Sequence, residues 1–153
     1  MFGVDTELGV PLGNYSDGNS VGGGALLTGE LTMLEALSLT ARIGVQLHTD
    51  RTLGTTSSHV HAIPFLLGTK YYIGGEREGL FGSFELGMFD LITSITRTGP
   101  DVSSNDIRFG MGAGLGFQQD RWSARVSIHT QDVGNFGNAF VMSGGIGYQF
   151  VGL

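Results

Sequence analysis

The sequence predicts an all-β protein, an eight-stranded antiparallel up-and-down barrel, and three observations support this prediction. Apolar and polar residues alternate along successive segments of the chain, as they do in strands whose two faces lie in different environments. Short turns and long polar loops alternate between these segments. Charged residues make up only 14% of the chain, against ~25% in an average soluble domain, which indicates that much of the exterior lies outside water.

The clearest strand pair is a hairpin that comprises residues 107–117 and 122–130. One face of the first segment is apolar, from Ile107 to Phe117, and the other face carries Arg108 and four glycines. The second segment alternates in the same way, and only a short polar turn separates the two. Because side chains alternate across a strand, this pattern predicts a hairpin with one apolar and one polar surface.

Eight such segments are predicted as strands. Their expected limits are Phe2–Leu12, Val21–Met33, Leu37–His48, His59–Ile73, Leu80–Ser94, Ile107–Gln118, Trp122–Gln131 and Ala139–Phe150. The long loops are expected at 13–20, 49–58, 95–106 and 132–138, and the short turns at 34–36, 74–79 and 119–121. Long loops therefore collect at one end, and both termini lie at the end of the short turns. The alternation slips at Asp90, where a β-bulge is expected.

The charges within the predicted strands fall on the polar face, which is otherwise rich in Gly and Ser. The water-exposed face of a soluble barrel would instead carry many Lys, Glu, Asn and Thr. An eight-stranded barrel has an interior only just wide enough for side chains, and charges persist there when they are paired. We therefore expect an inside-out barrel with an apolar exterior and a polar, plugged interior. The expected interior charge network comprises Asp5, Glu7, Glu30, Arg42, Lys70, Glu85, Arg108, Arg125 and His129.

Pairs within this network can be predicted from the strand order. Arg42 is expected to pair with Glu30, because a tight turn joins their two strands. Arg108 and Arg125 lie on adjacent strands and are expected to use Glu85 and Glu7.

Aromatic residues gather at the predicted strand ends beside the short turns and at the carboxyl end of the last strand. Aromatic rings favour the boundary between membrane and water. The expected aromatic girdle comprises Tyr71, Phe117, Trp122, Tyr148 and Phe150.

Composition limits the function. A net charge of −6 without a basic cluster argues against a nucleic-acid partner. The chain has no cysteine, which excludes disulfides, thiolate metal sites and thiol chemistry.

The last strand carries the most specific motif, residues 143–150. It resembles the carboxyl-terminal assembly signal of bacterial outer-membrane barrels, with Ser143, Gly145, Tyr148 and Phe150 at the signal positions. Together with the eight-strand pattern, the chain resembles the small outer-membrane barrel families, namely the OmpA transmembrane domain, OmpX and the opacity-type proteins. The resemblance implies a transmembrane β-barrel with short periplasmic turns and long extracellular loops. It also implies recognition of the last strand by the barrel-assembly machinery.

The signal is normally terminal, whereas residues 151–153 follow it here. We expect residues 1–150 to form the barrel and 151–153 to be a tail or the start of a removed carboxyl-terminal extension. The chain shows no signal peptide, so Met1 is expected to be an expression start joined to a mature sequence.

Two other kinds of site are weaker interpretations. His59 and His61 share a strand face and His48 lies across a loop, a set that suits zinc or copper. His48 has the inward parity and the other two point outward, so no metal or other cofactor is expected. Ser127, His129 and Asp132 suit a hydrolase, as in some barrel enzymes that modify lipid A. Ser127 and His129 face inward and no nucleophile motif surrounds the serine, so no enzymatic activity is expected.

The sequence thus predicts a bacterial outer-membrane protein with a structural or interactive role, namely membrane integrity and surface contact through the loops. The alternative is a narrow channel for ions or small solutes, and a lipid A-modifying enzyme is a less favoured one. A soluble lipocalin-like binder is a further possibility, which requires the reversed facing. The expected partners are outer-membrane lipid, lipopolysaccharide and a surface partner at the acidic loops, and the chain is expected to be a monomer.

Overall fold

The computed structural model describes residues 1–12, 20–49, 51–53, 56–96, 102–135 and 140–151. These residues form nine strands and one short 3-10 helix. In chain order they are β1 (Phe2–Pro11), β2 (Gly22–Leu34), β3 (Leu37–His48), β4 (Arg51–Leu53), β5 (Thr56–Tyr72), β6 (Gly79–Thr96), β7 (Val102–Gln119), β8 (Trp122–Thr130), η2 (Val133–Asn135) and β9 (Phe140–Val151). Within this part of the chain, no helix is long and apolar enough to cross a membrane.

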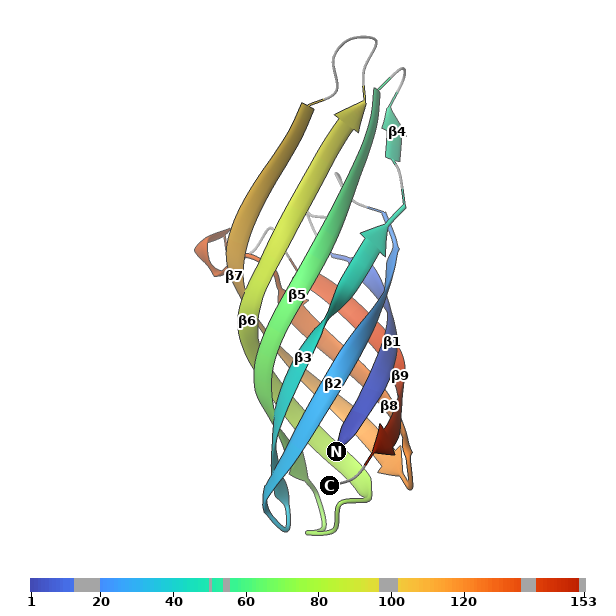
Figure 1. The fold of residues 1–153 in the computed structure, drawn as a ribbon, viewed down its shortest axis with the longest axis vertical. Helices are drawn as coiled ribbons and strands as arrows, with labels where there is room; N and C mark the ends of the chain where they lie inside the picture. Colours follow the sequence, from blue (N-terminus) through green and yellow to red (C-terminus); the bar gives the residue numbers. More distant parts are fainter. Residues whose placement is uncertain (13–19, 50, 54–55, 97–101, 136–139, 152–153) are drawn as a thin grey trace.

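Eight of the strands close into an antiparallel barrel (Figure 1). The order around it is β3-β2-β1-β9-β8-β7-β6-β5, and a β3–β5 pairing closes the ring. The first and last strands pair directly, with Leu8 opposite Gly144. The ninth strand, β4, pairs only with the beginning of β5. The predicted all-β, eight-stranded, antiparallel up-and-down barrel is therefore confirmed.

The short turns lie together at the end of the barrel that also holds both chain ends (Figure 1). The turn between β5 and β6 uses Gly74, Gly75 and Gly79 with φ of 118°, 83° and 94°, values that glycine adopts readily and other residues do not. In the tight β7–β8 turn the same left-handed region is occupied by Asp120, at φ 52°. Aspartate is one of the few other residues that tolerate this conformation.

The barrel wall is taller on one side than the sequence predicted. The expected loop at 95–106 is largely strand, because β6 continues to Thr96 and β7 begins at Val102, with Ile95 opposite Val102. The expected loop at 49–58 likewise contains β4 and the start of β5. These extensions rise above the other strands (Figure 1). Their sequences lack the apolar alternation of the other strands, while strand pairing still satisfies the backbone hydrogen bonds.

The expected bulge at Asp90 is wrong. Pairing runs without a shift through Ile63↔Asp90 and Asp90↔Ile107, so β6 keeps one parity along its length. The alternation appeared to slip because Phe81 and Phe89 lie on the inward face together with Glu85, where all three are buried. Register shifts occur instead at Phe2/Gly3 and Thr32/Leu34.

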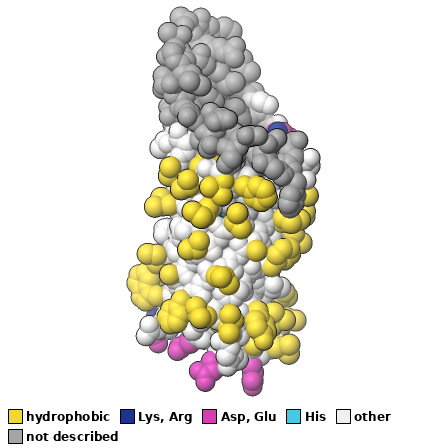
Figure 2. Space-filling model, turned by 180° about the vertical axis from the view of Figure 1, so that it is seen from behind, with side chains coloured by type: hydrophobic (Ala, Val, Ile, Leu, Met, Phe, Trp, Pro, Cys, Tyr) yellow, Lys and Arg dark blue, Asp and Glu magenta, His cyan; other side chains and the backbone are white. Residues whose placement is uncertain are grey.

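Apolar side chains form the outer surface of the barrel. Leu27 is 61% exposed and Leu115 is 68% exposed, whereas Glu7, Arg42 and Glu85 are buried inside. In Figure 2 hydrophobic side chains cover the visible face of the described barrel, and acidic side chains gather below them at the short-turn end. The facing is thus the reverse of a water-soluble barrel, as the parity of the charges indicated.

Candidate functional site

The centre of the barrel holds five ionised side chains from four strands, which we call the central ion-pair cluster. Its members are Asp5 and Glu7 of β1, Arg42 of β3, Glu85 of β6 and Arg125 of β8. These side chains meet because inward positions at similar heights on opposite walls face one another across a narrow interior. Three carboxylates thus surround two guanidinium groups.

Arg42 connects the acids of the cluster. Its Nε lies 3.2 Å from an oxygen of Asp5, and its two Nη atoms lie 3.1 Å from Glu7 and 3.0 Å from Glu85. Its side chain is only 4% exposed. A buried guanidinium persists when its charge is compensated, and three carboxylates do so here. The two Nη atoms donate to Glu85 and Glu7, whereas Nε makes no hydrogen bond to the described residues.

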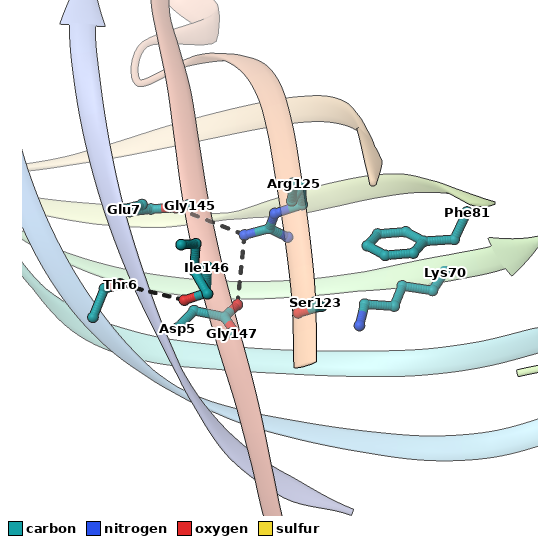
Figure 3. A pocket seen from close by; sticks show the side chains of 10 residues that line it. All are labelled: Asp5, Thr6, Glu7, Lys70, Phe81, Ser123, Arg125, Gly145, Ile146 and Gly147. Atoms are coloured by element: carbon teal, nitrogen blue, oxygen red, sulfur yellow. Dashed lines mark hydrogen bonds and ion pairs between the residues drawn. The ribbon is translucent and has the colours of Figure 1, made fainter. Parts of the chain in front are cut away.

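Arg125 completes the cluster from the opposite wall. Its Nη1 donates to Glu85 at 2.8 Å, and its Nη2 lies 3.7 Å from both Asp5 and Glu7. Figure 3 shows this guanidinium directed at the two β1 acids, with Lys70 and Phe81 beyond it. Lys70 is 4.7 Å from the centre of the Phe81 ring, within the range of a cation–π contact.

A second polar cluster lies nearer the short turns, around Glu30. Lys70 Nζ and the Tyr72 hydroxyl donate to Glu30 at 3.0 Å and 2.9 Å. The same hydroxyl lies 2.9 Å from the side-chain oxygen of Gln118, and the Gln149 amide donates to Glu30 at 3.3 Å. The carboxylate of Glu30 therefore accepts hydrogen bonds from two other strands, β5 and β9.

The two remaining predicted members of the interior network, Arg108 and His129, belong to neither hydrogen-bonded cluster. Arg108 lies toward the long-loop end, is 40% exposed, and binds Asp106 at 2.8 Å and Asp132 at 2.5 Å. His129 is stacked on Phe89, with ring centroids 5.9 Å apart. Its Nε2 has no hydrogen-bond partner among the described residues.

Two of the predicted pairings are therefore wrong. Arg42 does not lie opposite Glu30, because the register places Arg42 opposite Thr28 and Glu30 opposite Thr40. The two side chains therefore bind other partners. Arg108 does not reach Glu85 or Glu7, because its position opposite Phe89 places it beyond the central ion-pair cluster. The alternation correctly predicted that these charges face inward. It did not predict the position of each charge along the barrel axis, which depends on the stagger of the strands.

The spaces found between these described side chains are small. Two enclosed spaces, one beside Arg125 and one beside His129, measure about 10 Å³ each. A third, between the two polar clusters, measures about 20 Å³. A single water needs roughly 10–15 Å³ by the same measure, so each space has room for about one water. The barrel is plugged at its centre.

The aromatic girdle predicted from the sequence lies on the outer face at the short-turn end. Tyr71 is opposite Leu37, and Phe117 is opposite Leu80. Trp122 and Tyr148 are paired across β8 and β9, with ring centroids 4.8 Å apart. Phe150 continues the row outward on β9.

The four assembly-signal positions divide between the two faces of β9. Tyr148 and Phe150 point outward, whereas Ser143 is buried and shares a 2.8 Å hydrogen bond with Ser127. Gly145 lies opposite both Glu7 and Arg125. A Cβ atom at this glycine would lie 2.5 Å from the Thr6 carbonyl oxygen and 3.1 Å from the Cβ of Glu7. The glycine thus leaves the space that the central ion-pair cluster occupies.

Gly145→Ala is expected to lower the free energy of unfolding by about 1–3 kcal/mol, the usual cost of overpacking. Its neighbour gives a matched control, because a Cβ at Gly144 would come no closer than 3.9 Å to any heavy atom outside its chain neighbours. Denaturant unfolding of both alanine variants, refolded in vitro, measures this difference independently of cellular assembly. Equal stability of the two variants would contradict the steric role of Gly145.

The residues considered for hydrolysis do not assemble into a triad. Ser127 bonds Ser143, Asp132 binds Arg108, and the His129 ring stacks on Phe89. For the metal hypothesis, the side chain of His59 lies outside the described residues. Among the residues that are described, no group of three or more His, Cys, Asp or Glu side chains could hold a metal ion.

Sequence reasoning missed several neutral members of the interior. Gln46 donates to Glu7 at 2.6 Å, and Tyr72 and Gln118 organise the cluster around Glu30. The sequence could have identified the first two, because a residue at an even spacing from an inward charge on the same strand also faces inward. Gln46 lies four residues after Arg42, and Tyr72 lies two residues after Lys70. For Gln118, at the end of its strand, no such charged neighbour marked the position.

Comparison with known proteins was informative at the level of structure. No protein-family model matches the chain, and no curated protein matches it in sequence. Ail, the attachment invasion locus protein of Yersinia pestis, superposes with a TM-score of 0.70 at 14% identity, covering 97% of this chain and 96% of Ail. Ail has also been solved in complex with the heparin analogue sucrose octasulfate.

Two further outer-membrane barrels match equally completely. The N-terminal β-barrel domain of Pseudomonas aeruginosa OprF gives a TM-score of 0.65 at 15% identity, and Neisserial surface protein A gives 0.68 at 12%. Each match covers 97% of both chains. Strand number, closure and facing all agree with this similarity. The chain has the fold of the small eight-stranded outer-membrane β-barrels.

Proposed function

We propose that this chain is an outer-membrane protein of a Gram-negative bacterium with a structural and interactive role. It stabilises the membrane and contacts its surroundings through the long-loop end. The observation that carries the proposal is the combination of an apolar exterior with an interior closed by the central ion-pair cluster. In this placement the short turns face the periplasm and the long loops face the outside.

The placement fits the dimensions of the bilayer. Outward apolar residues run from the aromatic girdle up to Ile63 and Ile107, which flank Asp90, over barrel strands of nine or more residues. Tilted strands of ~9–11 residues are sufficient to cross the hydrocarbon core. The last strand carries the features by which the barrel-assembly machinery recognises its substrates, and the closed ring leaves no free edge at membrane depth, which is consistent with a monomer.

A narrow channel is the second hypothesis, and the interior spaces argue against it. Ions need a continuous path lined by exchangeable ligands, but Arg42 and Arg125 span the lumen at the same height as three acids. A lipid A-modifying enzyme is less favoured still, since Ser127 and His129 are turned away from lipid. A changed mass of lipid A on expression, abolished by His129→Ala, would reverse that judgement.

In planar bilayers the purified protein is expected to produce no discrete conductance steps, because the central ion-pair cluster blocks the lumen. Arg125→Ala removes part of the block, and Arg121→Ala, in an exposed turn, serves as its control. Wild-type conductance that Arg125→Ala alters and Arg121→Ala does not would establish the channel instead. A chain that stays monodisperse without detergent would contradict the membrane placement itself.

The loop end favours a cationic or cation-bridged contact. Its described charges are Asp106 and Asp132 around Arg108, whose guanidinium is already engaged. The sequence adds Asp17, Asp50 and Asp101 against Arg51 and Arg97 in the long loops, so acids outnumber bases at this end. This end therefore offers little to an anionic ligand such as the one bound to Ail, and we propose contact with lipopolysaccharide through divalent cations. Retention of lipopolysaccharide that a chelator does not reduce would contradict this contact.

A further inference from the structure

An apolar groove of about 560 Å³ crosses the outer surface of the barrel near the short turns. Its floor is formed by Gly29 of β2 and Ala41 of β3, which are directly paired. Phe2 and Leu67 stand on either side of this pair, opposite Gly29 and Ala41 respectively. Leu31 and Leu39 complete the lining toward the short turns.

The groove exists because two adjacent outward positions carry almost no side chain. The next row toward the long loops is Val4, Leu27, Ile43 and Phe65, which is filled throughout. A hydrocarbon chain fits such a depression because the surrounding side chains contact it from three sides, which increases dispersion contacts relative to a flat wall.

One end of the groove is basic. Arg77, in the turn between β5 and β6, belongs to its lining. The Nη2 of Arg77 lies 3.8 Å from the buried carboxylate of Glu30, and Nε and Nη2 are themselves buried without a hydrogen-bond partner among the described residues. The side chain as a whole is 35% exposed, so a ligand contacts the remainder of the guanidinium. A second outward groove, of about 410 Å³ around Gly23 and Gly144, has no basic residue in its lining.

Acidic side chains surround this arginine at the short-turn end. Glu76 and Glu78 flank it in the turn, and Glu35 lies in the neighbouring β2–β3 turn, all three exposed. Figure 2 shows acidic side chains collected below the hydrophobic surface at this end of the barrel. The three exposed glutamates outnumber the two cations in the groove lining, Arg77 and the Met1 ammonium, which disfavours a headgroup that carries only negative charge.

We propose that this groove binds one phosphatidylethanolamine molecule of the periplasm-facing leaflet. An acyl chain lies over Gly29 and Ala41, the phosphate contacts Arg77, and the ethanolamine ammonium faces the glutamates of the two turns. The inference rests on the membrane placement proposed above. It adds a specific lipid site and a preference for a zwitterionic over an anionic phospholipid.

Native mass spectrometry of the detergent-purified barrel tests the site, with phosphatidylethanolamine and phosphatidylglycerol titrated separately. The wild type is expected to retain phosphatidylethanolamine better. Arg77→Gln is expected to weaken that retention about fivefold, the effect of one arginine near a membrane surface. Arg121→Gln, which changes an exposed arginine of the other short turn at this end, is expected to have no effect.

Filling the groove tests the acyl-chain site. Ala41→Leu is expected to reduce retention of both lipids, whereas Ala113→Leu, at an exposed outward position on β7, is expected to leave it unchanged. Gly29→Val provides a second filling variant, because a Cβ there would meet only ordinary contacts at 3.8 Å or more. Each variant is first shown to be folded on a gel in detergent, where unheated and heated samples of a folded barrel migrate differently.

Equal retention by Ala41→Leu and Ala113→Leu would overturn the groove as a lipid site. Retention of phosphatidylglycerol equal to phosphatidylethanolamine in the wild type would overturn the headgroup assignment. Both results can be obtained with an intact barrel in detergent, so neither depends on the membrane placement being wrong. A wrong membrane placement would be revealed separately, by a chain that stays monodisperse without detergent.

Discussion

Replacing Arg42 by methionine is expected to lower the free energy of unfolding by about 3–5 kcal/mol, the cost of leaving a buried charge without its partner. Methionine approximates the length of the arginine stem but supplies no charge to Asp5, Glu7 and Glu85. Arg125 alone then faces three carboxylates in a space with little room for water. Equilibrium unfolding by denaturant, in detergent or in lipid vesicles, measures the change.

Two variants show whether charge balance is the cause. Arg121→Met alters an exposed arginine in the β7–β8 turn and is expected to change stability by less than about 0.5 kcal/mol. Adding Glu85→Gln to Arg42→Met returns the central ion-pair cluster to its original excess of one negative charge, and is expected to recover part of the loss. If the double variant is less stable than Arg42→Met by the full effect of Glu85→Gln alone, the two sites are independent and the electrostatic account fails.

The central ion-pair cluster explains why the alternation of polar and apolar residues predicted so much of this fold. Asp5, Arg42 and Arg125 mark the inward face of their strands, where their charges are paired. Asp90 is the exception, because it lies on the outward parity of β6 between Ile63 and Ile107. Leu27 and Leu115 mark the outward face of their strands. Strand number, facing and the end at which the turns collect all follow from alternation and connection length, which are local properties of the sequence.

The ion pairs that cross the barrel interior could not be predicted from alternation and connection length. Glu85 reaches Arg42 from a strand that is not its neighbour, and their contact depends on barrel closure and stagger. Neutral groups such as Gln46 and Tyr72 were missed because only charges were sorted by face. The tall hairpin of β6 and β7 was missed because alternation is informative only where the two faces differ in environment.

Introducing arginine on the outer surface tests the facing on which the membrane assignment depends. Leu27→Arg is expected to destabilise the barrel in lipid vesicles by about 2–4 kcal/mol, since the position lies in the filled apolar row between the girdle and the long loops. Leu34→Arg is a closely matched control. It changes the same residue type in the same strand, at 66% exposure against 61% for Leu27, but it lies at the short turn.

Near the membrane boundary an arginine costs only ~0–1 kcal/mol, because its guanidinium reaches the headgroups and water. The difference in stability between the two variants therefore reports the depth of each position in the membrane. It does not report exposure, because the two leucines are almost equally exposed. In a water-soluble barrel both leucines would face solvent, and both substitutions would be harmless or stabilising. A large loss at Leu27 with little change at Leu34 requires hydrocarbon around the middle of the barrel, whereas equal and small effects would place the outer surface in water.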